Sequence, residues 1–364
     1  MNRKKAISKA VESVNQHQLE FTSLFQQKTG QPKATPTSEI CGLSTGSRIH
    51  PIHRGSGKEA ARSPGTAANC KKYQMQREYP ISPNFAAQTR NDVVIREISC
   101  KTILNRTSIS DYSLNCYTGC AHSCIYCYAR SMQRFHPHPE PWGKFVDIKL
   151  NAVEVLERQL RRAAPGAVFV SSACDGWQPI EAECKLTRQC CDLLLKHGFQ
   201  IEALTKSSLV LRDLDIFSGR NTRIGVTVTT PDECLRRLWE PNSSSIEERF
   251  RIISEADAAG VETAIMFGPL LPFLSDSQES INSMFQRAAE LTVGVIWVDA
   301  LNPRPKVWSS IASLLRKKYP DLLERYRQIL FDRKTHAAYL SELRHSVTQA
   351  GTKFSLADKV TVCF

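Results

Sequence analysis

The sequence predicts an α/β protein built on a partial (βα)6-type TIM barrel, with a basic, mostly irregular N-terminal extension and C-terminal helices. Three observations predict this fold. From about residue 98, short apolar runs with strand character alternate with amphipathic helical runs. Five or six such repeats follow one another, which is the pattern of a parallel sheet with right-handed crossovers. The preceding residues and the last sixty lack this alternation.

The N-terminal extension, residues 1–95, is rich in Gly, Ser, Thr and Pro and has no sustained apolar period beyond one helix expected near 6–27. Residues 1–90 contain 14 Lys and Arg against 5 Asp and Glu, so they carry +9 of the chain's formal net charge of +12. A basic tail of this kind binds nucleic acid through its phosphates, or it is a solvated tail that keeps a protein soluble. The sequence is consistent with both interpretations of this extension.

The barrel is expected over residues 96–305. Its apolar strands are predicted at 167–173, 200–207, 223–230, 261–269 and 294–303. The intervening helical runs are predicted at 186–198, 210–217, 245–260 and 275–292. Residues 306–364 should form a helical extension with a short tail, packed on the open side of the barrel.

Polar residues stand where the predicted strands end. In βα barrels the chemistry gathers at the carboxyl ends of the strands, so these residues are candidates for a site. They are Cys174, Asp175, Thr205, Lys206, Thr227, Thr229, Asn302 and Arg304.

The chain has 13 cysteines, an odd number, and its first residues read as basic and polar without an apolar leader segment. We therefore expect a reduced, cytoplasmic protein. No window reaches the roughly 20 apolar residues that a membrane helix needs, so no membrane partner is expected. Cys184, Cys190 and Cys191 lie in a leucine-rich helical run, where core packing is the expected role.

The segment NCYTGCAHSCIYCYAR places Cys120, Cys124 and Cys127 in the spacing C-x3-C-x2-C, within a loop at 116–127. Three thiolates at this spacing can hold three irons of a [4Fe–4S] cluster and leave the fourth iron open. A small molecule with an amine and a carboxylate can chelate that iron, and S-adenosylmethionine (SAM) has such an end. This spacing at the head of a βα barrel, with Tyr126 before its last cysteine, resembles the signature of the radical SAM enzymes.

The resemblance narrows to the branch related to spore photoproduct lyase and covers roughly residues 111–305. It implies a [4Fe–4S] cluster, SAM, an electron donor such as a flavodoxin or ferredoxin, and reductive SAM cleavage to a 5′-deoxyadenosyl radical that acts on an unidentified substrate. It places Tyr126, Lys206, Thr227 and Gly268 beside SAM. A cation at the end of a strand, such as Lys206, can also pair with the SAM carboxylate on physical grounds.

In two places the chain departs from that pattern. Cys116 is a fourth cysteine where relatives carry proline. The loop could therefore also be a structural four-cysteine metal site, and the protein would then be a nucleic-acid-binding protein. Structural zinc prefers paired knuckles with a longer spacer, which disfavours this alternative.

The second departure concerns the cysteine from which the lyase donates a hydrogen atom. That position is Ser172 here, and Cys174 lies two residues later. We expect Cys174 to line SAM, with hydrogen donation as its alternative catalytic role. His122, between two predicted ligands, is expected at the surface or bonded to cluster sulfur rather than bound to iron.

Overall fold

The computed structural model describes residues 88–90, 92–134, 137–302, 304 and 306–364. The helix expected near 6–27, and nearly all of the predicted N-terminal extension, lie outside the described residues. Strand β2 (Val93–Ile98) crosses the boundary that the sequence placed between residues 95 and 96. No helix among the described residues has the length and apolar character needed to span a membrane.

The larger sheet confirms the predicted barrel core. It has eight strands in the order β12-β11-β10-β9-β8-β7-β4-β3, all parallel to their neighbours except β3, which runs antiparallel to β4. The strands are β3 (Leu104–Arg106), β4 (Tyr112–Leu114), β7 (Ala167–Val170), β8 (Gln200–Thr205), β9 (Thr222–Val228), β10 (Glu262–Leu270), β11 (Val295–Ala300) and β12 (Val360–Val362). The six strands β4 and β7 to β11 form the partial barrel.

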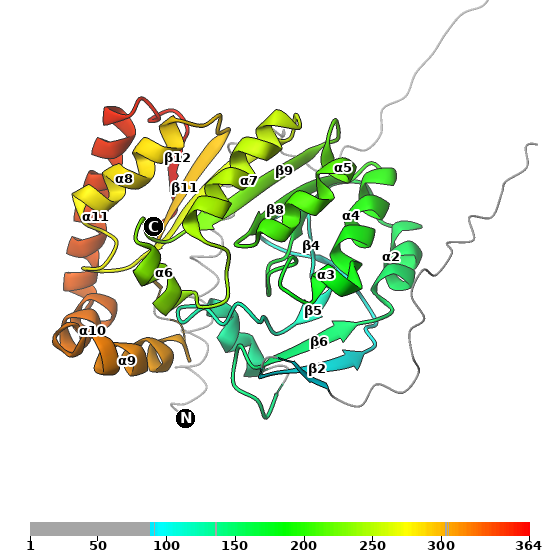
Figure 1. Cartoon of the computed structure of the whole chain (residues 1–364), viewed down its shortest axis with the longest axis horizontal. Coiled ribbons are helices and arrows are strands. Elements are labelled where there is room, and N and C mark those ends of the chain that lie inside the picture. Colours follow the sequence, from blue (N-terminus) through cyan, green and yellow to red (C-terminus); the bar gives the residue numbers. More distant parts are fainter. Residues whose placement is uncertain (1–87, 91, 135–136, 303, 305) are drawn as a thin grey trace, which may run out of the picture. The chain divides into compact units, whose positions relative to one another are not determined.

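Helices follow these strands along the chain, as the alternating pattern predicts, and form an arc around the strands (Figure 1). They are α2 (Ala152–Leu160), α3 (Glu181–Cys184), α4 (Leu186–Lys196), η2 (Ser208–Asp213), α5 (Leu214–Phe217), α6 (Glu233–Trp239), α7 (Ile246–Ala258) and α8 (Gln278–Ala289). The C-terminal extension consists of α9 (Val307–Lys318), η3 (Pro320–Leu322), α10 (Leu323–Phe331) and α11 (Arg333–Lys353).

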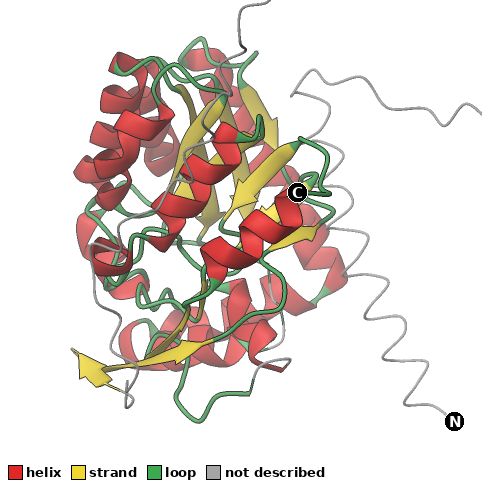
Figure 2. Cartoon of the chain, turned by 90° about the vertical axis from the view of Figure 1, so that its right-hand side faces the viewer, coloured by secondary structure: helices red, strands yellow, loops and turns green. Residues whose placement is uncertain are grey.

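The two faces of the larger sheet have different cores. The main apolar cluster includes Val226, Ile265 and Ile296 and joins the strands to their helices. Because successive side chains of a strand point to opposite faces, the residues between these point inward. A smaller cluster there includes Phe169, Met266 and Trp297. The helices cover the outer face of the sheet (Figure 2) and leave its inner face to line the barrel.

A second, four-stranded sheet has the order β1-β2-β6-β5, with β1 at Gln88–Arg90, β5 at Tyr117–Thr118 and β6 at Phe145–Lys149. The sequence did not predict this sheet or the parallel pairing of β12 with β11. Three of these strands have two or three residues. Runs that short have no period of their own, so their pairing depends on neighbours distant in sequence.

Candidate active site

The cysteine loop follows β5 and ends at the 3-10 helix η1 (Tyr128–Arg134). Gly119, which precedes the first cysteine of the triad, has a φ of 85°. A Cβ at this position would lie 2.4 Å from the carbonyl oxygen of Phe145. Only glycine fits this turn without displacing β6, so the residue before Cys120 fixes the path by which the loop leaves the sheet.

Hydrogen bonds from distant parts of the chain fix the loop. Gln178 accepts from the backbone N–H of Ala121 (2.8 Å), and Asn242 donates its side-chain amide to the carbonyl of the same residue (2.8 Å). The N–H of Ile125 donates to the carbonyl of Trp239 (2.9 Å). The loop is therefore anchored to the segments that follow β7 and α6.

The three predicted ligands lie in this anchored loop. Cys120 and Cys124 are buried and Cys127 is half-buried. Burial raises the pKa of all three thiols, and the neighbouring cysteines raise that of Cys120 further. At Cys127 the backbone N–H groups of Ala129 and Arg130 act in the opposite direction and favour the thiolate.

The fourth cysteine of the motif has a different environment. Cys116 is fully buried in the main apolar cluster, and its Sγ lies 3.7 Å from the Sγ of Cys190 on α4. Cys190 and Cys191 belong to the same cluster and Cys184 packs against it, as the helical run predicted. A four-cysteine site would need Cys116 beside the other three, but this thiol is part of the core.

The donor set of the triad fits a cluster better than a single ion. Within the described ranges, no three side chains of His, Cys, Asp or Glu converge as ligands of one metal ion would. A cubane cluster requires a different arrangement, because each thiolate binds its own iron at a separate corner. The anchored loop offers Cys120, Cys124 and Cys127 for such a cluster, while its fourth cysteine, Cys116, lies in the core.

Asp175, which follows β7, joins the cysteine loop to the end of β8. It accepts hydrogen bonds from the Thr205 hydroxyl (2.7 Å) and the Lys206 backbone N–H (2.8 Å), both at the end of β8. Its Oδ2 lies 3.4 Å from Nδ1 of His122. Burial raises the pKa of Asp175, but His122 and these hydrogen bonds outweigh burial and hold it well below its usual range. His122 is buried, so the expectation of a surface position was wrong.

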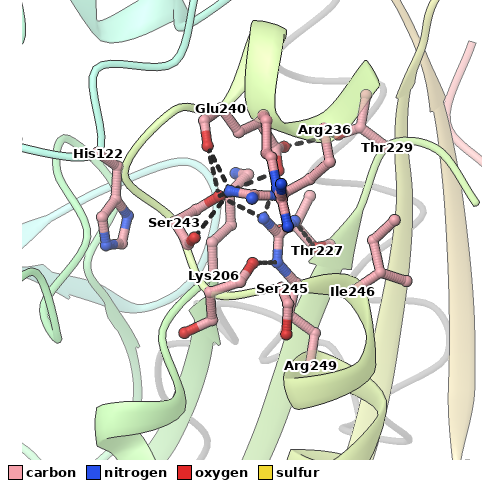
Figure 3. A network of polar contacts seen from close by, with 12 residues as sticks. His122, Lys206, Thr227, Thr229, Arg236, Glu240, Ser243, Ser245, Ile246 and Arg249 are labelled. Carbon is pink, nitrogen blue, oxygen red and sulfur yellow. Dashed lines mark hydrogen bonds and ion pairs between the residues drawn. The ribbon is translucent and has the colours of Figure 1, made fainter. Parts of the chain in front are cut away.

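A buried ion pair lies beside the loop (Figure 3). Arg249 on α7 pairs with Glu240, which follows α6, and both side chains are fully buried. Glu240 also accepts hydrogen bonds from the hydroxyls of Tyr126 and Thr229. Burial raises the pKa of Glu240, but Arg249 and Lys206 outweigh burial and lower it to about 2. The carboxylate therefore stays ionised beside the cysteine loop.

Lys206 extends into the same network (Figure 3). Its ammonium lies 5.8 Å from the centre of the Tyr126 ring. Burial lowers its pKa, but Cys124 and Glu240 raise it by more, so the side chain remains a cation. In the described part of the chain, its Nζ has no ion pair or hydrogen bond. This buried ammonium is thus free to bind an added anionic group.

Thr227 and Gly268 lie close to this network. The Thr227 carbonyl accepts a hydrogen bond from Arg249 (2.8 Å), and the Gly268 carbonyl accepts one from Thr229 (3.1 Å). A Cβ at Gly268 would lie 3.0 Å from the Asp299 carbonyl. The small residue lets β10 and β11 approach closely at their carboxyl ends.

Cys174 lies on the other side of the loop. It packs with Cys120 and Cys127 beside Phe145. Its Sγ is 3.6 Å from the Tyr117 carbonyl and 3.9 Å from Oδ1 of Asn115. Burial raises its pKa to about 12, so the thiol is neutral. Cys174, Lys206, Thr227 and Gly268 thus lie near the carboxyl ends of β7, β8, β9 and β10, and the contacts above join them to the cysteine loop.

The sequence did not reveal Glu240 or Arg249. Arg249 belongs to the set Ile246, Arg249, Phe250 and Ile253, which has the spacing of a buried helix face. An arginine in such a face is a signal that a buried acid lies nearby. Tyr128 was also missed: its hydroxyl donates to the carbonyl of Ser172, and the Arg304 guanidinium lies 5.6 Å from the centre of its ring.

Comparisons with known proteins agree with this geometry. A family model described as the radical SAM superfamily matches residues 114–284. An uncharacterized protein of Methanocaldococcus jannaschii is 32% identical over 187 residues, covering 50% of this chain and 70% of that protein. An uncharacterized protein of Mycobacterium tuberculosis is 28% identical over 281 residues, covering 73% of this chain and 82% of that protein.

Solved structures give the same fold. Spore photoproduct lyase complexed with dinucleoside spore photoproduct superposes with a TM-score of 0.57 and 13% identity, covering 74% of this chain and 82% of that one. A mutant of the lyase with bound SAM and the same dinucleoside gives 0.57 and 14%, covering 75% and 82%. The chain belongs to the radical SAM superfamily, whose cofactors are a [4Fe–4S] cluster and SAM.

Proposed function

We propose that this chain holds a [4Fe–4S] cluster through Cys120, Cys124 and Cys127 and cleaves SAM reductively. When bound, the cluster and SAM supply a 5′-deoxyadenosyl radical that abstracts a hydrogen atom from the substrate. The observation that carries the proposal is the set of three adjacent thiols in one anchored loop, with Cys116 withdrawn into the core. A flavodoxin or ferredoxin of the cytoplasm is the proposed electron donor.

The residues around the thiols have separate roles in this proposal. The Lys206 ammonium binds the SAM carboxylate, because it is a buried cation beside the cysteine loop that forms no ion pair with the described residues. Glu240 and Thr229 hold the Tyr126 hydroxyl, which keeps that ring beneath Lys206. Thr227 and Gly268 would line the SAM site, since both lie at the carboxyl ends of their strands and contact the Arg249–Glu240 network.

Each thiol of the triad can be tested against a matched cysteine of the same segment. Cys120→Ala, Cys124→Ala and Cys127→Ala should each abolish the iron–sulfur absorbance and the iron content of anaerobically purified protein. Cys116→Ala should keep both, because that thiol lies against Cys190. Iron retained in any triad variant and lost in the Cys116 variant would mean that the ligands are wrongly assigned.

Cys174 is proposed to line SAM rather than to donate a hydrogen atom. Its thiol lies beside Cys120 and against the Tyr117 carbonyl, which favours contact with the bound cofactor. Cys174→Ser should therefore preserve iron content and release of 5′-deoxyadenosine, measured by chromatography. Normal SAM cleavage with an accumulating off-pathway substrate adduct would identify the thiol as the donor instead.

Nucleic acid is the substrate class that we propose. The lyase of the same fold was solved with a dinucleoside, and the N-terminal quarter of this chain carries +9 of its charge. With reductant and SAM present, ultraviolet-irradiated DNA or an RNA digest should increase 5′-deoxyadenosine release above the rate without substrate. Stimulation by a peptide digest alone would exclude this substrate class and leave the cofactor chemistry standing.

A further inference from the structure

A basic groove of about 980 Å³ lies between α2 and strands β3 and β4. Its lining includes five cationic side chains and no acidic one: Lys101, Arg106, Arg158, Arg161 and Arg162. Tyr112, which begins β4, and Ala164, which precedes β7, also line it. The groove therefore lies at the amino end of the parallel strands, whereas the triad lies at their carboxyl end.

The charge of the groove is not neutralised by its surroundings. In the part of the chain that the structure describes, none of its five cations forms an ion pair, although many other arginines do. Glu154 and Glu157 are exposed on α2 but do not line the groove. Residues 91–364 carry a net charge of only +3, so these cations are a local concentration in a nearly balanced domain.

The walls of the groove are held together. Gln159 on α2 accepts hydrogen bonds from the N–H groups of Ile103 (2.8 Å) and Leu104 (3.0 Å) and donates one to the Leu104 carbonyl (2.7 Å). The Arg106 guanidinium lies 4.2 Å from the centre of the Tyr112 ring. The cations thus project from a preformed scaffold, which lowers the entropic cost of binding a ligand.

A helix dipole accounts for part of this cluster only. Basic residues near the end of α2 stabilise its carboxyl end. That argument does not reach Lys101 and Arg106, which come from the β3 side of the groove. Cations from two separate walls that face one space indicate an anionic ligand between them.

We propose that this groove binds the phosphate backbone of a nucleic-acid strand. Four of the five cations are arginines, whose planar fork matches phosphate oxygens in a bidentate manner. A line of phosphodiesters is an extended, evenly charged ligand that suits an open groove with no counter-charge. The groove does not touch the triad, so it serves as an anchor and is independent of the proposed radical chemistry.

The test uses the full chain and a fluorescein-labelled oligothymidylate of about twelve nucleotides, followed by anisotropy over a range of salt concentrations. Arg158→Gln/Arg161→Gln/Arg162→Gln should weaken binding at least tenfold. It should also reduce the slope of log affinity against log salt by about 2, since each phosphate contact in a single strand contributes about 0.7. The double variant Lys101→Gln/Arg106→Gln, on the other wall, should also weaken oligonucleotide binding and reduce its salt dependence.

The chain offers a matched control. Arg316, Lys317 and Lys318 are exposed in the last turn of α9, so their triple replacement by Gln removes the same charge from the same kind of position. Its affinity should stay within twofold of the wild type. Equal losses in the α2 and α9 variants, or no loss in either, would overturn the proposal. The proposal would also be overturned if polyglutamate displaced the labelled oligonucleotide as well as unlabelled oligonucleotide does. The iron content of each variant is measured as well, so that loss of the cluster can be distinguished from loss of oligonucleotide binding.

Discussion

A buried arginine–glutamate pair lies near each end of the parallel strands, and the pKa values of the two glutamates shift in opposite directions. At the carboxyl edge, Glu240 pairs with Arg249 and accepts from two hydroxyls, and its pKa is lowered to about 2. Nearer the amino ends of the strands, Glu202 pairs with Arg223 at 3.3 Å, and burial raises its pKa to about 7 against the effect of that arginine.

The two carboxylates differ in both charge and hydrogen bonding. Arg249 and Lys206 both lower the pKa of Glu240, whereas Arg223 acts on Glu202 against the carboxylates of Glu262 and Asp111, which raise its pKa. Among the described residues, Oε2 of Glu202 and Nε of Arg223 have no hydrogen-bond partner. A buried carboxylate with incomplete partners is costly, whereas one with a full set is stable as an anion. The chain therefore fixes a permanent negative charge beside the cysteine loop and keeps a protonatable one at the opposite end.

The largest effect is expected from breaking the first pair. Arg249→Met leaves Glu240 buried without its cation and should lower the free energy of unfolding by about 3–5 kcal/mol. Arg223→Met should cost about 1–2 kcal/mol, because Glu202 can take up a proton near neutral pH. Denaturant unfolding of the two variants at pH 7 measures both. Equal losses would show that the two pairs do not differ.

Lys206 is a further charged group at the carboxyl edge. If its ammonium binds the SAM carboxylate, Lys206→Met should weaken SAM binding ten- to a hundredfold, about 1.5–3 kcal/mol for a hydrogen bond to a charged group. Lys206→Arg keeps the positive charge and should lose less SAM affinity than the Met variant. Anaerobic titration calorimetry of iron-loaded protein measures both variants. Unchanged SAM affinity in the Met variant would remove Lys206 from the cofactor site.

The two glutamates should also give opposite pH dependence. Glu202 binds its proton more tightly in the folded chain, so its contribution to stability is greatest at low pH and falls as pH rises from 4.5 to about 7. Glu202→Gln should therefore abolish a loss of about 1–2 kcal/mol between pH 5.5 and 7.5. Parallel stability curves for the variant and the wild type would contradict this.

Glu240 has the reverse sign. Its lowered pKa stabilises the folded chain above pH 4.5, and this contribution is lost as pH falls toward about 2.

A smaller effect is expected from Tyr126→Phe, which removes one hydroxyl donor to the Glu240 carboxylate. We expect a loss of about 1 kcal/mol in unfolding free energy with iron content unchanged. Loss of iron instead would mean that this ring positions the thiols.

Periodic apolar runs made the barrel predictable. The expected strand at 223–230 is β9 at Thr222–Val228, and the expected helix at 245–260 is α7 at Ile246–Ala258. Such elements carry their own pattern, because each buries one face against the same core. Strand β12 carries no pattern and exists through its pairing with β11.

The site was predictable to a similar degree. A local spacing selected the three cysteines as candidate ligands, and strand ends selected Lys206 and Asp175, which the structure places beside the cysteine loop. Glu240 could not be found in this way, because its burial depends on Arg249 and Tyr126, which lie on separate segments. The surface position expected for His122 was wrong for the same reason, since its partner Asp175 is far along the chain, while the alternative of a bond to cluster sulfur stays a prediction.

The anchors of the cysteine loop have a consequence for maturation. Gln178 and Asn242 hold both backbone groups of Ala121 from opposite sides of the loop, and Gly119 fixes its entry. None of these contacts uses the thiol of Cys120, Cys124 or Cys127, so the path of the loop does not depend on the three predicted ligands. In small zinc domains the metal organises the chain. Here neighbouring protein groups organise the loop, so we expect folding of the chain and assembly of the proposed cluster to be separable steps.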